Sequence, residues 1–196
     1  MKRTNYSAAM MTLSCLLVFS PAVIGPAYAA NLANMMGITI TPNPIENTGN
    51  VLLFVLPATA VGFSLYNKDV NGLFQYGAVA LLTEVTTLTL KKSVHELRPN
   101  GSDYLSFPSG HASTTFAAAA FIQRRYGWEY GIAAYALAAF TGYSRVESKE
   151  HYVHDVLAGA AIGVGSIYIF TKPFHRFQVQ PTTDGKHFGV VVSKTF

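Results

Sequence analysis

The sequence predicts an all-α protein, a compact bundle of five core helices that spans a membrane. Half of its 196 residues are hydrophobic, and they gather in five apolar stretches separated by polar turns. Alanine and glycine are dense in the last three stretches, where small side chains let helices approach closely, in membranes and in tight soluble bundles alike. A single domain is expected, because the chain is long enough for one core and short for two.

Residues 1–29 have the layout of a secretory signal peptide. Lys2 and Arg3 precede an apolar run, and small residues spaced as Ala27-Tyr28-Ala29 follow it, so cleavage is expected after the last of them. The alternative is an uncleaved signal anchor helix, because the apolar run over 8–24 is nearly long enough to cross a bilayer. Both alternatives predict that the rest of the chain is exported.

The composition narrows the function classes. The only cysteine, Cys15, lies in the expected signal, so a mature exported chain would have no disulfide and no cysteine-bound metal. Without Lys2 and Arg3, 12 basic and 10 acidic residues remain, a net charge of +2, and no basic run is interleaved with aromatic residues. The sequence therefore gives no indication of nucleic-acid binding.

The first two apolar stretches are expected to be helices that end at polar residues. Residues 41–50 are polar and contain prolines, so the first helix is expected over 51–66, where the segment NKDVNG closes it. The second covers 73–90 and ends at Lys91 and Lys92.

The last three helices are expected to be rich in small residues. The third helix runs from His111 to the segment QRRYG at 123–127, the fourth covers about 128–143, and the fifth covers about 153–170. The segment FPSGHAS before the third helix contains Ser109, a residue type that caps helix N-termini.

The charges favour a membrane protein. A membrane span needs roughly 20 apolar residues, and only the first, second and fifth stretches approach that length. If residue 31 lies in the periplasm, the turns that face the cytoplasm are basic, as the positive-inside rule expects. These turns contain Lys68, Arg124, Arg125, Lys172 and Arg176. We therefore predict a bacterial inner-membrane protein, with a soluble or surface-associated periplasmic helical protein as the alternative.

The C-terminal tail is expected to be an appendage. It contains Asp-Gly and an alternating apolar end, a pattern that allows a short β-hairpin. The predicted organisation is a signal or anchor over 1–29, a helical domain over 30–172 and a tail over 173–196.

Polar residues cluster in three islands at the ends of the predicted helices. The islands are KKSVHELRP (91–99), PSGH (108–111) and SRVESKEHYVHD (144–155). Each has a simpler interpretation when taken alone. Lys91 and Arg98 can be interfacial charges.

The third island also has two simpler interpretations. Arg145 can pair with Glu147 or Glu150 as a surface ion pair that contributes little to stability. The segment HYVHD, which begins at His151, has spacing that is plausible for a metal site formed with His154 and Asp155.

Together, the islands suit one ligand, a phosphate. Lys91, Arg98 and Arg145 would neutralise its two charges, and the arginines offer planar forks to its oxygens. Ser109 and the amides around Gly110 are expected at a helix N-terminus, where free N–H groups and the helix dipole favour an anion. Glycine also lets the backbone come close to the ligand.

Two histidines can supply the chemistry. His151 and Asp155 are spaced i and i+4, so they are expected to share a helical face. The carboxylate can then accept the proton of one ring nitrogen and leave the other as a nucleophile. His111, in the first turn of the third helix, is free to protonate a leaving alkoxide.

In order and internal spacing, the three islands resemble the signature of the type 2 phosphatidic-acid phosphatase (PAP2) superfamily. This superfamily also includes bacterial class A acid phosphatases and vanadium haloperoxidases. The resemblance covers about residues 45–171. The short linker NGSDYLSF (100–107) is more similar to membrane lipid phosphatases than to soluble acid phosphatases.

The resemblance implies roles for the matching residues. His151 is expected to form a phosphohistidine, with Asp155 as its orienting partner and His111 as the general acid. The phosphate cradle is expected to consist of Lys91, Arg98, Ser109, Gly110 and Arg145. His95, His154 and Lys92 match no signature position. Family members need no metal, so neither a cofactor nor a metal site is expected.

The sequence around the three islands suggests the substrate. Segments such as NGLFQYGAVALLTEVTTLTLKK look similar to lipid A 1-phosphatases, so lipid A 1-phosphate in the outer leaflet is the favoured substrate. Undecaprenyl diphosphate, phosphatidate and phosphatidylglycerophosphate stay open, because the cradle recognises phosphate and not the lipid. The expected partners are the substrate lipid and the bilayer, with neither nucleic acid nor an obligate protein partner indicated.

Three other functions are compatible with the same residues. One is a soluble periplasmic acid phosphatase for small phosphomonoesters. Another is a vanadium haloperoxidase, which would require vanadate, whereas vanadate should inhibit a phosphatase. The last is a helical scaffold with an inert pocket, which the complete set of signature residues disfavours.

Overall fold

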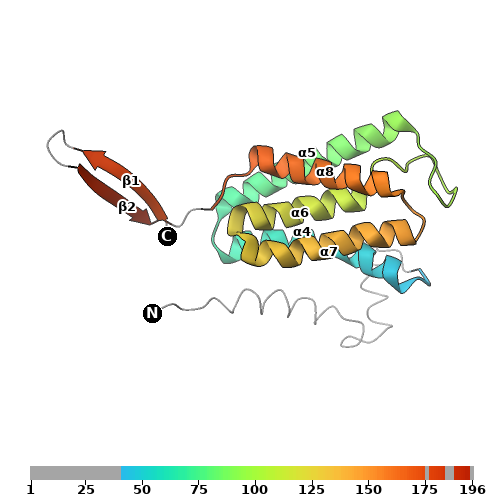
Figure 1. Cartoon of the computed structure of the whole chain (residues 1–196), viewed down its shortest axis with the longest axis horizontal. Helices are drawn as coiled ribbons and strands as arrows, with labels where there is room; N and C mark the ends of the chain where they lie inside the picture. The colour runs from blue at the N-terminus through green and yellow to red at the C-terminus, as the bar shows by residue number, and fades with distance from the viewer. Residues whose placement is uncertain (1–40, 175–176, 184–187, 195–196) are drawn as a thin grey trace.

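The computed structural model describes residues 41–174, 177–183 and 188–194, so the expected signal over 1–29 lies outside the described residues. Five helices form the predicted all-α bundle, and a two-stranded antiparallel sheet follows them (Figure 1). The helices are α4 (Pro44–Tyr66), α5 (Val70–Val94), α6 (Gly110–Tyr126), α7 (Trp128–Glu147) and α8 (Val153–Phe170). The prediction of five core helices is confirmed.

The tail forms the expected β-hairpin. Strand β1 (Phe177–Thr183) pairs with β2 (Phe188–Lys194), from Phe177 opposite Lys194 to Thr183 opposite Phe188. Figure 1 shows the hairpin beyond the end of α8, away from the helices.

Helix α4 begins earlier than expected, at Pro44 and not at residue 51. The side chain of Asn43 caps it by accepting from the backbone N–H of Ile45 at 2.9 Å and of Glu46 at 3.4 Å. Proline at the first helical position lacks an N–H that the helix would leave unpaired. The prolines that suggested a loop therefore start the helix, which adds about two turns that carry Glu46 and Asn50.

Helix α6 is the centre of the bundle and contacts the other four helices. Its segment from Ala117 to Ile122 is buried throughout, with Phe121 fully enclosed. Three other helices bring Leu56, Tyr76 and Ala138 into the same core. Burial on all sides explains why this middle segment of α6 is apolar all round.

Small residues let α8 lie directly against α6. A Cβ atom on Gly159 would overlap the carbonyl oxygen of Ser109, and one on Gly163 would overlap that of Ser113. Backbone atoms cannot move aside as a flexible side chain can, so both positions require glycine. This packing fixes the start of α8 beside the start of α6.

Three helices are long and apolar enough to cross a membrane, namely α4, α5 and α8. These are the three stretches that the sequence indicated. The active-site loops all lie at one end of the bundle, and the turn between α4 and α5 and the ends of α6 and α8 lie at the other (Figure 1).

The opposite end of the bundle is held by a buried ion pair. Arg125 donates through Nε and Nη2 to the two carboxylate oxygens of Asp69, each at 2.7 Å, and through Nη1 to the carbonyl of Lys172 at 2.6 Å. The hydroxyl of Tyr126 donates to Asp69 at 3.0 Å. Arg125, one of the basic residues assigned to the cytoplasmic turns, is therefore neutralised within the protein.

Candidate active site

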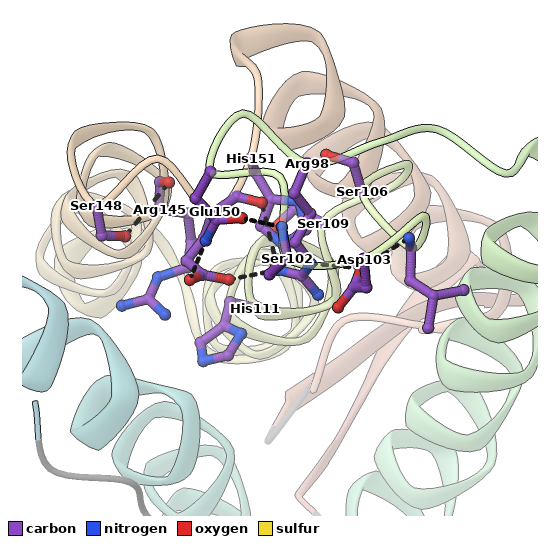
Figure 2. Close-up of polar contacts among 12 residues, drawn as sticks. Arg98, Ser102, Asp103, Ser106, Ser109, His111, Arg145, Ser148, Glu150 and His151 are labelled. Atoms are coloured by element: carbon purple, nitrogen blue, oxygen red, sulfur yellow. Dashed lines mark hydrogen bonds and ion pairs between the residues drawn. The ribbon is translucent and has the colours of Figure 1, made fainter.

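The three polar islands meet in one pocket at the end of the bundle. The cavity has a volume of about 340 Å³, within the usual range for a small-ligand site. It is lined by Leu53, Glu84, Lys91, Arg98, Gly110, His111, Thr114, Arg145, Glu150 and His151. Six of the eight predicted site residues thus line it, while Ser109 and Asp155 lie just behind its wall. Figure 2 shows most of these side chains grouped above the first turn of α6.

Lys91, near the end of α5, is tied to the loop that precedes α6. Its Nζ donates to the carbonyl of Leu105 at 2.6 Å and lies 3.4 Å from the carbonyl of Ser106. Lys92 is exposed and does not line the pocket. The structure therefore places Lys91, and not its neighbour, on the site.

The first turn of α6 begins with Ser109, as the sequence predicted. Ser109 is fully buried, and its Oγ accepts from the N–H of Ala112 at 3.4 Å. A Cβ on Gly110 would make only ordinary contacts, 3.9 Å from Cε of Lys91 and 4.0 Å from Cγ2 of Thr87. Packing does not demand glycine at 110, so its absent side chain leaves open space on the pocket side.

His151 and Asp155 lie together, but they do not share a helical face as predicted. Helix α8 begins at Val153, so His151 precedes it in the loop, while Asp155 stands in its first turn. Nδ1 of His151 lies 3.5 Å from Oδ2 of Asp155. The chain bends at Glu150 and His151 and is extended at Tyr152, and this places the imidazole beside the start of the helix.

Asp155 is fully buried and fixed by several donors. Its Oδ2 accepts from the hydroxyl of Ser106 at 2.5 Å and from the N–H of Tyr152 at 2.9 Å. Its backbone carbonyl accepts from the N–H of Ser109 at 3.0 Å. These bonds connect the second and third islands and hold the carboxylate in place beside His151.

Burial and positive charge favour the neutral form of both pocket histidines. Burial, followed by the charges of Lys91 and Arg98, lowers the pKa of His151 to about 4. Burial, followed by the charge of Arg145, lowers the pKa of His111 to about 3. A neutral imidazole retains the lone pair that a nucleophile needs.

The arginines have partners that the sequence did not indicate. Arg98 donates to Glu150 at 2.6 Å through Nη1 and to Asp103 at 2.8 Å through Nε. The hydrogen bond from Arg98 lowers the pKa of Asp103. Figure 2 shows Glu150 between Arg98 and Arg145. Glu150 thus pairs with Arg98, and the alternative surface pair of Arg145 with Glu147 or Glu150 does not form among the described residues.

The first two turns of α4 hold Arg145. It is 3% exposed and donates to Oδ1 of Asn50 at 2.9 Å and to the carbonyl of Glu46 at 2.7 Å. The same Oδ1 lies 3.1 Å from Nε2 of His111. Sequence reasoning missed Asn50, although the helix-start signal of Asn43 followed by proline would have placed it on a helix.

Glu96, His154 and Asp155 form a second cluster beside the site. Nε2 of His154 lies 2.8 Å from Glu96 and 3.2 Å from Oδ1 of Asp155, and the three ligand atoms lie within 4.8 Å of one another. The metal interpretation of HYVHD therefore changes its members, because Glu96 takes the place of His151. His95 ends α5 in a left-handed conformation and does not line the pocket.

Comparison with known proteins places these features in a family. Residues 72–178 match the PAP2 superfamily. The chain is 33% identical over 141 residues to a lipid A 4′-phosphatase of Helicobacter pylori, an alignment that covers 66% of this chain and 71% of that protein. It is 45% identical over 78 residues to a lipid A 1-phosphatase of Porphyromonas gingivalis, but spans only 17% of that protein's length.

The fold has a counterpart among solved structures. The crystal structure of Aquifex aeolicus LpxE aligns with a TM-score of 0.50, covering 71% of this chain and 92% of that one at 19% identity. A helical bundle that gathers cations and histidines around one pocket has the construction of an enzyme for phosphate-group chemistry. Since the family match covers more than half of the chain, the protein belongs to the PAP2 superfamily. It is a membrane phosphatase.

Proposed function

We propose that the protein removes a phosphate group from a membrane lipid at the periplasmic face, with lipid A 1-phosphate as the favoured substrate. The observation that carries the proposal is the convergence of His151, His111 and three cations from separate helix ends on one pocket. The names of the relatives support a lipid substrate, since both are lipid A phosphatases.

In the proposed first step, Nε2 of His151 attacks phosphorus. Asp155 lies on the Nδ1 side of the ring, so its carboxylate can accept a hydrogen bond from the Nδ1 proton and stabilise the positive charge that develops on the ring. The bond between phosphorus and the leaving oxygen breaks, and its electron pair stays with that oxygen. His111 gives this oxygen a proton and a phosphohistidine remains.

In the second step, a water molecule replaces the histidine. His111, now neutral, takes a proton from the water as the water oxygen attacks phosphorus, and His151 leaves as a neutral imidazole. Phosphate is the second product. The reaction balances without a metal or an oxidant.

The cations hold the phosphate through both steps. Lys91, Arg98 and Arg145 come from three different elements, so together they can contact several oxygens and stabilise charge in the transition state. Arg98 binds Glu150 in the structure, and we propose that the substrate displaces this carboxylate. Ser109 and Gly110 would add the backbone N–H groups at the start of α6.

The membrane topology supports a periplasmic site. The three candidate spans make an integral protein the better proposal over the soluble periplasmic alternative. Delivery of the region after the expected signal to the periplasm would place the pocket loops on that side, with Lys68 and Arg124 on the cytoplasmic side. The domain boundaries at residues 29 and 172 are part of the same proposal.

Two measurements test the proposal. Lipid mass spectrometry of cells with and without the chain should show loss of one phosphate from lipid A, and fragment ions identify the 1 or 4′ position. Brief exposure to a ³²P-labelled substrate should label the wild-type protein through an acid-labile bond, and the His151→Ala variant should stay unlabelled. Label on the His151→Ala protein would contradict the assignment of His151 as the nucleophile. A changed polyprenyl pool with unchanged lipid A would contradict lipid A as the substrate.

A further inference from the structure

Asn50 links the two sides of the pocket from α4, which precedes the segment that matches the family. Its Oδ1 accepts from Nη1 of Arg145 at 2.9 Å and lies 3.1 Å from Nε2 of His111. Asn50 is 9% exposed. One amide oxygen thus contacts both a cation of the phosphate cradle and the proposed general acid. Because Asn50 is nearly buried, little water can take the place of this oxygen.

The contact with Arg145 determines the chemistry of the contact with His111. A guanidinium only donates, so the atom of Asn50 that it reaches must be the amide oxygen. An amide oxygen only accepts, so Nε2 of His111 must carry a hydrogen to bond to it. In the neutral ring, Nδ1 then has no proton, and it is the nitrogen that gains one when the ring becomes positively charged.

The backbone of α4 is fixed where Asn50 projects from it. A Cβ on Gly49 would overlap Oγ of Ser144 and lie 2.9 Å from Nη2 of Arg145. The carbonyl of Glu46, one turn earlier, accepts from the same Nη2 at 2.7 Å. Helix α4 therefore rests directly on the end of α7, and the position of Asn50 is set by backbone contact.

We infer that Asn50 is a positioning residue that fixes His111 with its proton on Nε2 and thereby makes Nδ1 the atom that protonates the leaving oxygen. When the bond to phosphorus breaks, the electron pair goes to the oxygen and the Nδ1 proton follows. His111 returns to the neutral form that Asn50 favours. This inference rests on the proposed function, because it assigns an atom to the acid step.

The test compares two leaving groups in the same detergent micelles. Asn50→Leu should slow hydrolysis of an alkyl phosphate by about 10- to 100-fold, part of the typical contribution of general acid catalysis. It should affect nitrophenyl phosphate little, because nitrophenolate leaves without a proton. Asn50→Asp, which keeps the acceptor oxygen, should recover much of the alkyl activity. Asn47→Leu is the matched control, since Asn47 lies on the same helix and bonds to Thr41 outside the pocket.

Two readouts separate this role from simple support of the fold. Asn50→Leu should add no further defect in a His111→Ala background, and ¹⁵N spectra should show the Nε2 proton of His111 in the wild type but not in Asn50→Leu. Equal loss with both leaving groups in Asn50→Leu, or an added defect without His111, would overturn the inference. Equal losses in His111→Ala itself would instead remove the acid step from the proposed function.

A separate observation concerns Glu84, a carboxylate inside a candidate span. It lines the pocket from α5, two helical turns before Lys91. Its side chain is exposed and its charge acts on Lys91, but among the described residues it forms no hydrogen bond or ion pair. Glu150, the other pocket carboxylate, is paired with Arg98. An ionisable residue within a membrane helix is costly and typically serves a function.

Glu84 can only repel the phosphate itself, so it must face another part of the substrate. The backbone positions of Glu84 and Lys91 lie two helical turns, roughly 10 Å, apart along the axis, and the charge of Glu84 still acts on Lys91. A phosphate bound at Lys91 would then leave the group that bears it facing Glu84. A carboxylate there favours hydroxyl or amide N–H groups, which phosphorylated sugars have and which phosphatidate and polyprenyl diphosphates lack.

We also propose that Glu84 forms a subsite for the hydrogen-bond donors of a phosphorylated amino-sugar head group. The subsite deepens the proposed function by naming the substrate class. Glu84→Leu should raise KM for a phosphorylated N-acylglucosamine lipid by about tenfold, the usual scale for a hydrogen bond to a charged group. It should leave KM for phosphatidate unchanged or lower, because an anion has been removed. Glu129→Gln, at the other end of the bundle, is the control.

The result has three informative outcomes. A selective change with the sugar lipid supports the subsite. Equal changes with both lipids, or no change with either, overturn it while leaving the phosphatase proposal intact. Failure of the wild-type protein to hydrolyse either lipid would overturn the proposed function and the subsite together.

Discussion

Nδ1 of His151 lies 3.5 Å from Oδ2 of Asp155, although only Asp155 belongs to α8. The carboxylate keeps its place through Ser106 and the N–H of Tyr152. The relationship therefore depends on the loop before α6 as well as on the spacing of the pair. In the proposed reaction it makes Asp155 the group that stabilises the positive charge on the His151 ring.

Asp155→Asn should reduce kcat by about 10³- to 10⁴-fold, the scale seen when the analogous aspartate of a Ser-His-Asp triad is changed to asparagine. The amide can still bond to Ser106, so the protein should fold, but it cannot stabilise a positively charged His151. Steady-state kinetics and a melting curve in detergent test this. Glu147→Gln, away from the pocket, is the control, and a loss below tenfold would contradict the assigned role.

His151 should titrate well below an ordinary histidine. Burial and the cations lower its pKa to about 4, so the ring is neutral and nucleophilic above that pH and loses its lone pair as the pH falls through it. A ¹⁵N titration of the solubilised protein should therefore show His151 changing near pH 4. A midpoint near 6.5, the usual histidine value, would show that the site does not perturb it.

Phosphate should raise the pKa of His111. Burial and the charge of Arg145 lower this pKa to about 3, which leaves too little of the acid form at neutral pH. A bound phosphate dianion offsets the nearby positive charges and favours the protonated ring. The His111 signal should therefore titrate at higher pH with phosphate than without it. An unchanged midpoint at saturating phosphate would argue against a role as acid.

Gly163→Ala should destabilise the protein by about 1–3 kcal/mol, the usual cost of overpacking. The added methyl would overlap the carbonyl of Ser113 and lie 2.8 Å from the backbone nitrogen of Ala117. Thermal unfolding in detergent measures the change. Gly165→Ala is a matched control on the same helix, where the methyl would enter open space. Equal effects at both positions would mean that the contact between α6 and α8 is not the cause.

The Asp69 pair should stabilise the end of the bundle away from the pocket. Burial alone would raise the pKa of Asp69, but bonds from Arg125, Gly72 and Tyr126 outweigh it and lower the pKa. The stabilisation is therefore present at neutral pH and is lost as the pH falls through the lowered folded-state pKa. Asp69→Asn should cost about 3 kcal/mol or more, because it leaves Arg125 buried without its partner.

The unfolding of Asp69→Asn is best followed at pH 7 in detergent, with Asp103→Asn as the control. Asp103 also pairs with an arginine, but its side chain is 44% exposed, so its loss should matter little for stability. Similar midpoints for wild type and Asp69→Asn would show that the buried pair does not stabilise the bundle.

The amino-acid sequence by itself determined the five-helix bundle, the three spans and six residues of the pocket. Apolar stretches specify helices, and each of the three islands contains its functional side chains within a short segment of the sequence. Asn50 and the start of α4 escaped detection because prolines suggested a loop, although Asn43 and Pro44 form a local helix-start signal.

Only the tertiary structure decided which partners the charges take. Glu150 bonds to Arg98 and Asn50 reaches Arg145 because loops and helices distant in sequence pack at the same end of the bundle. The bend at Glu150 and His151 brings the imidazole beside Asp155, whose carboxylate is held by Ser106 from the loop before α6. Spacing along the chain fixes which residues are available, but contact between elements requires the packed core, where Gly159 and Gly163 bring α8 against α6.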